Sequence, residues 1–211
     1  MSEATDRLIL QLAADGEPVR RLRPPALRTV IWLGGTGLVA AAAVWGFADL
    51  QVFQERAREP ALMIELAATL LTGVTAVLAA FELSLPDRRP AWTLAPLPFL
   101  LVWIAASGTG CYRHFLAGEG WASAESLDCF IFILGASLPL GIALGLTLRK
   151  AHPLAPVRVA IIAGLGIAAL AAFLLQFFHP FDVTFLDLVI HALAVIIVTY
   201  AFGMVGKRGE A

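Results

Sequence analysis

Apolar stretches of about 20 residues alternate with short polar segments along most of the chain. Six of them are long enough to cross about 30 Å of hydrocarbon at about 1.5 Å per residue. Their expected limits are 29–47, 63–83, 92–110, 129–148, 159–178 and 185–205. A spanning segment must satisfy its own backbone hydrogen bonds, and the alternation typical of barrel strands is absent. The pattern therefore predicts an all-α, polytopic helical bundle.

Prolines divide the apolar stretches. The breaks between stretches coincide with Pro60, Pro86, Pro90, Pro153, Pro156 and Pro180. Pro96, Pro98 and Pro139 fall inside expected spans, where we predict kinks.

The composition agrees with a membrane protein. Of the 211 residues, 59% are hydrophobic and only 15% charged, and the mean hydropathy is +0.82, which excludes an ordinary soluble enzyme. The first apolar stretch begins near Thr29 after a charged segment, so we expect no cleavable signal peptide.

The distribution of Lys and Arg predicts the orientation. Of the 15 basic residues, only Arg56, Arg58 and Arg113 fall on one side of the expected membrane. The excess on the other side places both termini in the cytoplasm. We expect a cytoplasmic tail over 1–25, a transmembrane domain over 26–206 and a short cytoplasmic C-terminus over 207–211.

The tail has the pattern of a short amphipathic helix. Thr5 is a plausible N-cap, Asp6 would lie in the first turn, and Asp15-Gly16 would end the helix. Its apolar face would hold Leu8, Ile9 and Leu12.

Two interpretations of this helix stay open. So short a helix is marginal in water and would gain order by docking on a protein partner. Alternatively, it lies on the membrane surface, helped by Arg20, Arg21 and Arg23.

The only two cysteines, Cys111 and Cys129, are expected at the same outer membrane face. They can form a disulfide, bind a soft metal as thiolates or react with an oxidant, or they can simply pack as small apolar side chains.

Further polar residues are expected at the same depth. They are Glu65, Gln176, His179, Asp182, Asp187 and His191. Charges inside a bilayer usually point into the bundle and pair, so these residues predict a polar, thiol-containing pocket. Alternatively, Asp187 and His191, at i and i+4, form a structural pair and Glu65 extends to the interface.

Two other features are expected to be structural. Glu82 lies at the inner boundary, where it can pair with Arg88 or Arg89. Gly141 and Gly145 form a small-x-x-x-small pattern that permits close helix packing. No nucleotide-binding or hydrolase motif is present, and we predict no catalytic residue and no required cofactor.

Several short motifs in order along the chain carry a family resemblance. They are Thr5-Asp6-Arg7-Leu8-Ile9, Val19-Arg20-Arg21-Leu22-Arg23-Pro24-Pro25, Phe81-Glu82-Leu83-Ser84-Leu85-Pro86-Asp87-Arg88, Gly110-Cys111, Glu125-Ser126-Leu127-Asp128-Cys129 and Phe178-His179-Pro180-Phe181-Asp182. With the six spans, they resemble the NrsF family of bacterial anti-sigma factors.

The resemblance implies a multi-pass protein of the bacterial inner membrane that is not an enzyme. Such a protein holds an extracytoplasmic-function sigma factor at the membrane, without contacting nucleic acid itself, and releases it under metal or oxidant stress. The family's cysteine pair would map onto Cys111 and Cys129. We hypothesise that His179, Asp182, His191 and Glu65 assist them, with Cys111, Cys129 and His179 as candidate ligands of a soft metal ion that acts as the signal.

Two alternatives belong to other classes. In a membrane thiol-disulfide oxidoreductase, Cys111 and Cys129 would exchange electrons with a quinone, although a C-x-x-C motif and a second cysteine pair are absent. A small transporter would need broken helices repeated in two halves, which the sequence does not show.

Overall fold

The computed structural model describes residues 3–14, 21–116, 126–178 and 185–208, and these residues form helices with no strand. The elements are α1 (Glu3–Ala14), α2 (Pro25–Phe47), α3 (Leu50–Arg56), α4 (Pro60–Leu83), the 3-10 helix η1 (Pro90–Leu94), α5 (Leu97–Leu116), α6 (Ser126–Arg149), α7 (Pro156–Leu175) and α8 (Phe185–Arg208). Six segments are long and apolar enough to cross a membrane, which confirms the predicted multi-pass helical bundle.

Proline sets the start of three of the long helices. Pro25, Pro60 and Pro156 each occupy the first helical turn of α2, α4 and α7. Proline suits this position because its fixed φ is helical and its missing N–H would be unpaired there anyway. The expected starts of these spans were therefore about one turn too late.

The third span is divided. Pro96 separates η1 from α5, and Pro98 lies in the first turn of α5, whereas Pro139 lies inside α6 as expected. The short helix α3 was not predicted. Its start is capped by Asp49, whose carboxylate accepts from the backbone N–H groups of Gln51 and Val52.

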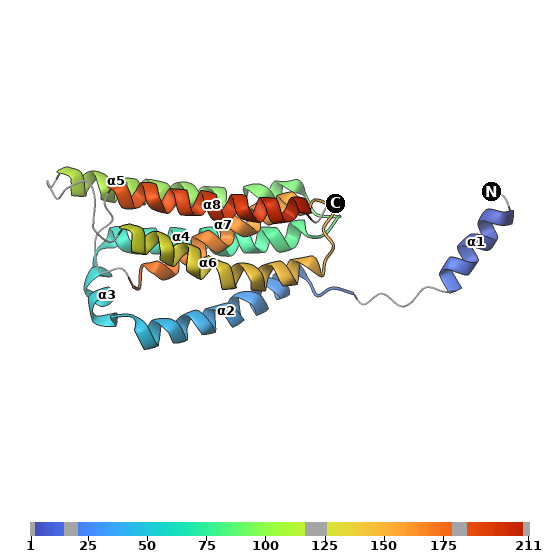
Figure 1. Cartoon of the computed structure of the whole chain (residues 1–211), viewed down its shortest axis with the longest axis horizontal. Helices are drawn as coiled ribbons and strands as arrows, with labels where there is room; N and C mark the ends of the chain where they lie inside the picture. Colours follow the sequence, from blue (N-terminus) through green and yellow to red (C-terminus); the bar gives the residue numbers. More distant parts are fainter. Residues whose placement is uncertain (1–2, 15–20, 117–125, 179–184, 209–211) are drawn as a thin grey trace.

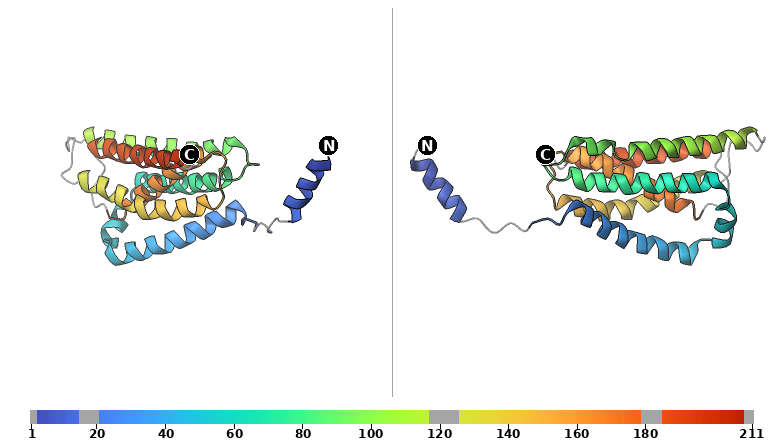
Figure 2. Two further views of the ribbon diagram at one scale, coloured as in Figure 1. Left: turned by 45° about the vertical axis from the view of Figure 1, so that its right-hand side comes forward. Right: turned by 180° about the vertical axis from the view of Figure 1, so that it is seen from behind.

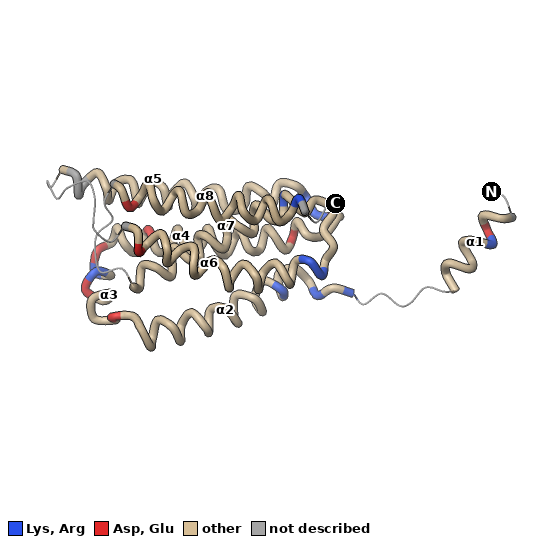
Figure 3. Tube along the Cα trace, viewed as in Figure 1, with Lys and Arg blue, Asp and Glu red and all other residues tan. Residues whose placement is uncertain are grey.

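The long helices run up and down, so their ends gather at two ends of the bundle, which we call the basic end and the far end (Figure 1). The basic end holds the start of α2, the end of α4 and the end of α8. The far end holds the starts of α4, α6 and α8 and the ends of α5 and α7. Most of the Lys and Arg of the bundle lie at the basic end, and most Asp and Glu lie at the far end around α3 (Figure 3).

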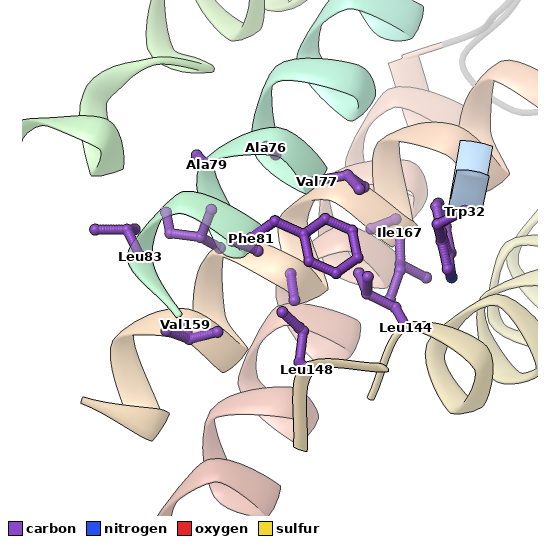
Figure 4. Packing of buried hydrophobic residues seen from close by; sticks show 14 of the residues in the cluster. Trp32, Ala76, Val77, Ala79, Phe81, Leu83, Leu144, Leu148, Val159 and Ile167 are labelled. Atoms are coloured by element: carbon purple, nitrogen blue, oxygen red, sulfur yellow. The ribbon is translucent and has the colours of Figure 1, made fainter. Parts of the chain in front are cut away.

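Helix α7 is the centre of the bundle and packs against α4, α6 and α8. The largest cluster of buried side chains includes Val77, Phe81, Leu144 and Ile167 (Figure 4). Helix α2 lies along one side of the bundle and is mostly exposed (Figure 2). Helix α1 stands apart from the bundle (Figure 1).

Small residues allow the closest helix contacts. A Cβ at Gly164 would lie 2.9 Å from Cβ of Phe202 and 2.9 Å from Cα of Thr199, both on α8. Of the predicted glycine pair, Gly141 also faces Phe202, whereas Gly145 has open space around it. The close α7–α8 contact therefore depends on Gly164. Of the predicted pair, only Gly141 lies at a close helix contact.

We expect Gly164→Leu to lower the free energy of unfolding by about 1–3 kcal/mol, because the new side chain overpacks the α7–α8 contact. Gly34→Leu on α2 is the matched control, since nothing lies within 4 Å of a Cβ at Gly34. Unfolding by SDS in mixed micelles, followed by circular dichroism, measures both. Equal losses in the two variants would contradict this account of the packing.

Candidate functional site

The far end brings together polar residues from five helices. Glu65 lies near the start of α4, Cys111 near the end of α5, Cys129 near the start of α6 and Asp187 near the start of α8. Gln176 directly follows α7. We call these residues, with Ser107 and His191, the far-end cluster.

Glu65 is held by a hydrogen bond from α5. The Oγ of Ser107 donates to Oε1 of Glu65 at 2.6 Å, and the indole of Trp103 lies near the same carboxyl group. Trp103, Ser107 and Cys111 are spaced at i, i+4 and i+8, so they share one face of α5. A carboxyl group at this depth needs such partners because the bilayer offers it none. Glu65 is thus partly buried and points toward α5.

Both cysteines are buried, and they are not joined in a disulfide. Cys111 is 4% exposed and lies within electrostatic reach of the carboxyl groups of Glu65 and Asp187. Cys129 is 2% exposed and packs with Ile133, on its own helix, and with Ala172 and Ala194, on α7 and α8. The chemistry of each thiol is therefore coupled to helix packing.

Asp187 and His191 lie one turn apart on α8, as predicted. Asp187 is fully buried, and His191 is partly buried. Both take part in interactions inside the protein. Asp187 thus places a carboxyl group of α8 near Cys111 of α5.

The unpredicted helix α3 contributes to the far end as well. Nη1 of Arg56 donates to the carbonyl oxygen of Gln176 at 3.3 Å, and Arg56 attracts the carboxyl group of Glu65. Phe53 stacks on Phe177 with ring centroids 4.5 Å apart. Helix α3 therefore lies near the start of α4 and contacts the segment that follows α7.

The described residues include no group of three or more His, Cys, Asp and Glu side chains that can hold a metal ion. His179 and Asp182, which were predicted to assist the cysteines, lie outside the described residues. The remaining candidate metal ligands are the two thiols.

The basic end has a second polar connection, centred on Arg28 of α2. Its Nη1 donates to Oγ of Ser84, after α4, at 3.2 Å, and its Nη2 donates to the carbonyl oxygen of Thr147 on α6 at 3.0 Å. Its guanidinium also lies 4.7 Å from the ring centroid of Phe81. We call this connection the Arg28 clamp, because one side chain joins α2 to α4 and α6.

A neighbouring ion pair confirms one structural expectation. Nε of Arg88 lies 3.1 Å from Oε2 of Glu82. Of the two predicted partners for Glu82, Arg88 forms the pair.

Helix α1 exposes its apolar side chains, with Leu8 55%, Ile9 51% and Leu12 66% exposed. Thr5 as N-cap is wrong: the helix begins at Glu3, a good helix former whose charge favours the first turn, so Thr5 and Asp6 both lie inside the helix. Arg21 and Arg23 are exposed before α2, and Arg20 lies outside the described residues.

Comparison with protein families identifies the chain. Residues 12–209 match the family described as NrsF, negative regulator of sigma F. The chain belongs to the NrsF family. Searches of curated proteins and of solved structures found no match.

The match gives this NrsF-family protein a role as a negative regulator of a sigma factor. It begins inside α1, so most of that helix precedes the matched region. The match covers the Arg28 clamp and every described residue of the far-end cluster.

Sequence reasoning did not find three residues that matter in this NrsF-family protein. Ser107 is the hydrogen-bond partner of Glu65 and Trp103 lies near the same carboxyl group, and their spacing from Cys111 on α5 was the available indication. Arg28 was seen only as part of a basic stretch. Its partners lie 56 and 119 residues away in sequence, so no local pattern reveals them.

We expect Ser107→Ala to lower the free energy of unfolding by about 1–3 kcal/mol, because the carboxyl group of Glu65 loses its close donor. Thr109→Ala is the control: this hydroxyl is exposed and donates only to the carbonyl of Ala106 on its own helix. A double-mutant cycle in mixed micelles with Glu65→Ala measures the coupling. A coupling near zero would show that the Ser107–Glu65 hydrogen bond does not stabilise the far end.

Proposed function

We propose that this protein is an anti-sigma factor of the bacterial inner membrane. It holds an extracytoplasmic-function sigma factor on the cytoplasmic side through its tail. It releases the sigma factor when an oxidant or a soft metal ion reacts with Cys111 and Cys129. The family match, negative regulator of sigma F, is the observation that carries the proposal.

Helix α1 is the proposed grip on the sigma factor. Twelve residues are too few for a stable isolated helix in water, and the exposed Leu8, Ile9 and Leu12 suit an apolar groove on a partner. Arg21 and Arg23 are exposed and can add contacts to an acidic surface of that partner. Binding to the membrane surface is the competing role of this helix.

The far-end cluster is the proposed sensor. In the oxidant case, the two thiols lose two protons and two electrons and form one S–S bond. These reduce hydrogen peroxide to two water molecules, or an organic hydroperoxide to an alcohol and water. In the metal case, the thiols lose their protons and bind a soft metal ion as thiolates. Both thiols are buried, so either reaction changes the packing among α5, α6, α7 and α8.

Helices α4 and α6 are the proposed connection between the two ends. From Cys129 to Thr147, α6 extends about 27 Å, and from Glu65 to Ser84, α4 extends about 28 Å. Each helix therefore reaches from the far-end cluster to a partner of Arg28. To move the tail from 99% bound to 99% released, the reacted sensor must favour release by about 5.5 kcal/mol.

The cysteine content supports regulation over thiol-disulfide turnover. The whole chain has two cysteines, so an oxidised pair has no second pair in the chain from which to take electrons. A single reaction that changes the state of the protein needs only one pair.

We expect Leu12→Asp to weaken sigma-factor capture about tenfold or more, because it places a charge on the apolar face of α1. Gln11→Asp adds the same charge on the polar face and should keep capture near wild type. Pull-down after co-expression with candidate sigma factors of the same bacterium measures both. Capture of none by the wild type would overturn the proposed function, and loss in neither variant would assign α1 to the membrane surface.

We expect Cys111→Ser/Cys129→Ser to capture the sigma factor normally and to release none of it after peroxide or cadmium treatment, as read by reporter transcription. Intact-mass measurement distinguishes the two reactions: a disulfide lowers the mass by two hydrogens, and metal binding raises it. Release by the double variant equal to wild type would remove the cysteines from the mechanism.

A further inference from the structure

A large groove lies between α2 and the helices α4, α6 and α7, away from the far-end cluster. Its volume is about 1190 Å³, above the range of about 300–1,000 Å³ that suits compact small molecules. One wall is α2, and the other is formed by α4, α6 and α7. A groove of this size and length suits a long, flexible ligand.

Most of the groove wall is apolar. The lining includes Ile31 and Val39 from α2, Val74 from α4, Leu140 from α6 and Leu170 from α7. The lining extends along α2 from Arg28 to Ala43, about 22 Å at about 1.5 Å per residue. Because half of the hydrocarbon core is about 15 Å thick, a groove of this length runs beside the acyl chains deep into the bilayer.

The mouth of the groove at the basic end is cationic. Arg21, Arg23, Arg28 and Lys150 line it, and no carboxylate is among the described lining residues. Guanidinium and ammonium groups together bind phosphate oxygens well, and Arg does so with two parallel hydrogen bonds. The guanidinium of Arg28 is already hydrogen-bonded to Ser84 and Thr147. The side chains of Arg21, Arg23 and Lys150 are exposed and are therefore accessible to a ligand.

Trp32 gives independent evidence for a ligand. It lies one turn after Arg28 and lines the groove, it is only 6% exposed, and its indole Nε1–H has no hydrogen-bond partner among the described residues. A buried indole N–H normally finds an acceptor. Because Nε1 is itself buried, the indole must turn toward the groove to meet an acceptor there, about 6 Å below the Arg28 level.

We propose that the groove binds one anionic phospholipid of the cytoplasmic leaflet. Its phosphate contacts Arg21, Arg23 and Lys150, and the acyl chains fill the apolar part. An ester carbonyl accepts from Nε1 of Trp32 once the indole turns toward the groove. This order of groups along the groove is the order along a glycerophospholipid. The inference depends on the membrane orientation but not on the sigma factor or the cysteines.

Binding of phosphatidylglycerol and phosphatidylcholine to the purified full chain, measured by native mass spectrometry from detergent, tests the lipid class. We expect phosphatidylglycerol to bind at least about tenfold more tightly than phosphatidylcholine. The double variant Arg21→Gln/Arg23→Gln should bind phosphatidylglycerol about tenfold more weakly than the wild type does. Arg89→Gln/Lys207→Gln is the charge-matched control, because neither residue lines the groove.

Two further variants test the position of the lipid. Trp32→Phe keeps the ring but loses the N–H donor, and we expect about fivefold weaker phosphatidylglycerol binding. Gly37→Leu places a side chain in the groove and should displace the lipid, whereas Gly34→Leu, on the same helix but outside the groove, should not.

Equal binding of the two lipids, or unchanged binding in the Arg21/Arg23 and Gly37 variants, would overturn the proposal and leave ordinary lipid contact only. A photocrosslinker at Ala40 in nanodiscs identifies the occupant directly. Capture of phospholipid supports the proposal, and capture of α1 or of a second copy of the chain instead would assign the groove to a protein segment. These measurements contain no sigma factor, so their failure leaves the proposed function unaffected.

Discussion

A polar side chain inside a bilayer must find its partners within the protein, and this constraint organises both ends of the bundle. At the far end, it brings Ser107 of α5 onto Glu65 of α4. At the basic end, it brings Arg28 of α2 onto Ser84 and Thr147. Each connection joins different helices, so the polar contacts help to fix how the apolar helices lie against one another.

The two connections share helix α4, and helix α6 carries both Cys129 at the far end and Thr147, a partner of Arg28, at the basic end. These two helices give the fold a route between its ends. A change at the far end acts on the start of α4 or α6, and the Arg28 clamp holds the other end of the same helices. The clamp in turn fixes the first turn of α2, to which the tail is attached. In the proposed function, the chemistry of two buried thiols thereby reaches a sigma factor on the opposite side of the membrane.

Length and apolar character predict the six spans because these properties are local and the bilayer thickness is fixed. Helix starts were less predictable, since Pro60 looked like a break and is in fact the first helical residue of α4. Topology placed Cys111 and Cys129 at one end of the bundle. The Arg28 clamp and the Ser107–Glu65 hydrogen bond arise from tertiary packing, which sequence spacing does not specify.

Hydrogen–deuterium exchange over residues 25–31, the first turns of α2, tests the link between the two ends most directly. The account predicts that reaction of the cysteines speeds amide exchange there in the wild type, because the Arg28 clamp loosens, and leaves exchange unchanged in Cys111→Ser/Cys129→Ser. Unchanged exchange in a wild-type protein that nevertheless releases its sigma factor would contradict the account.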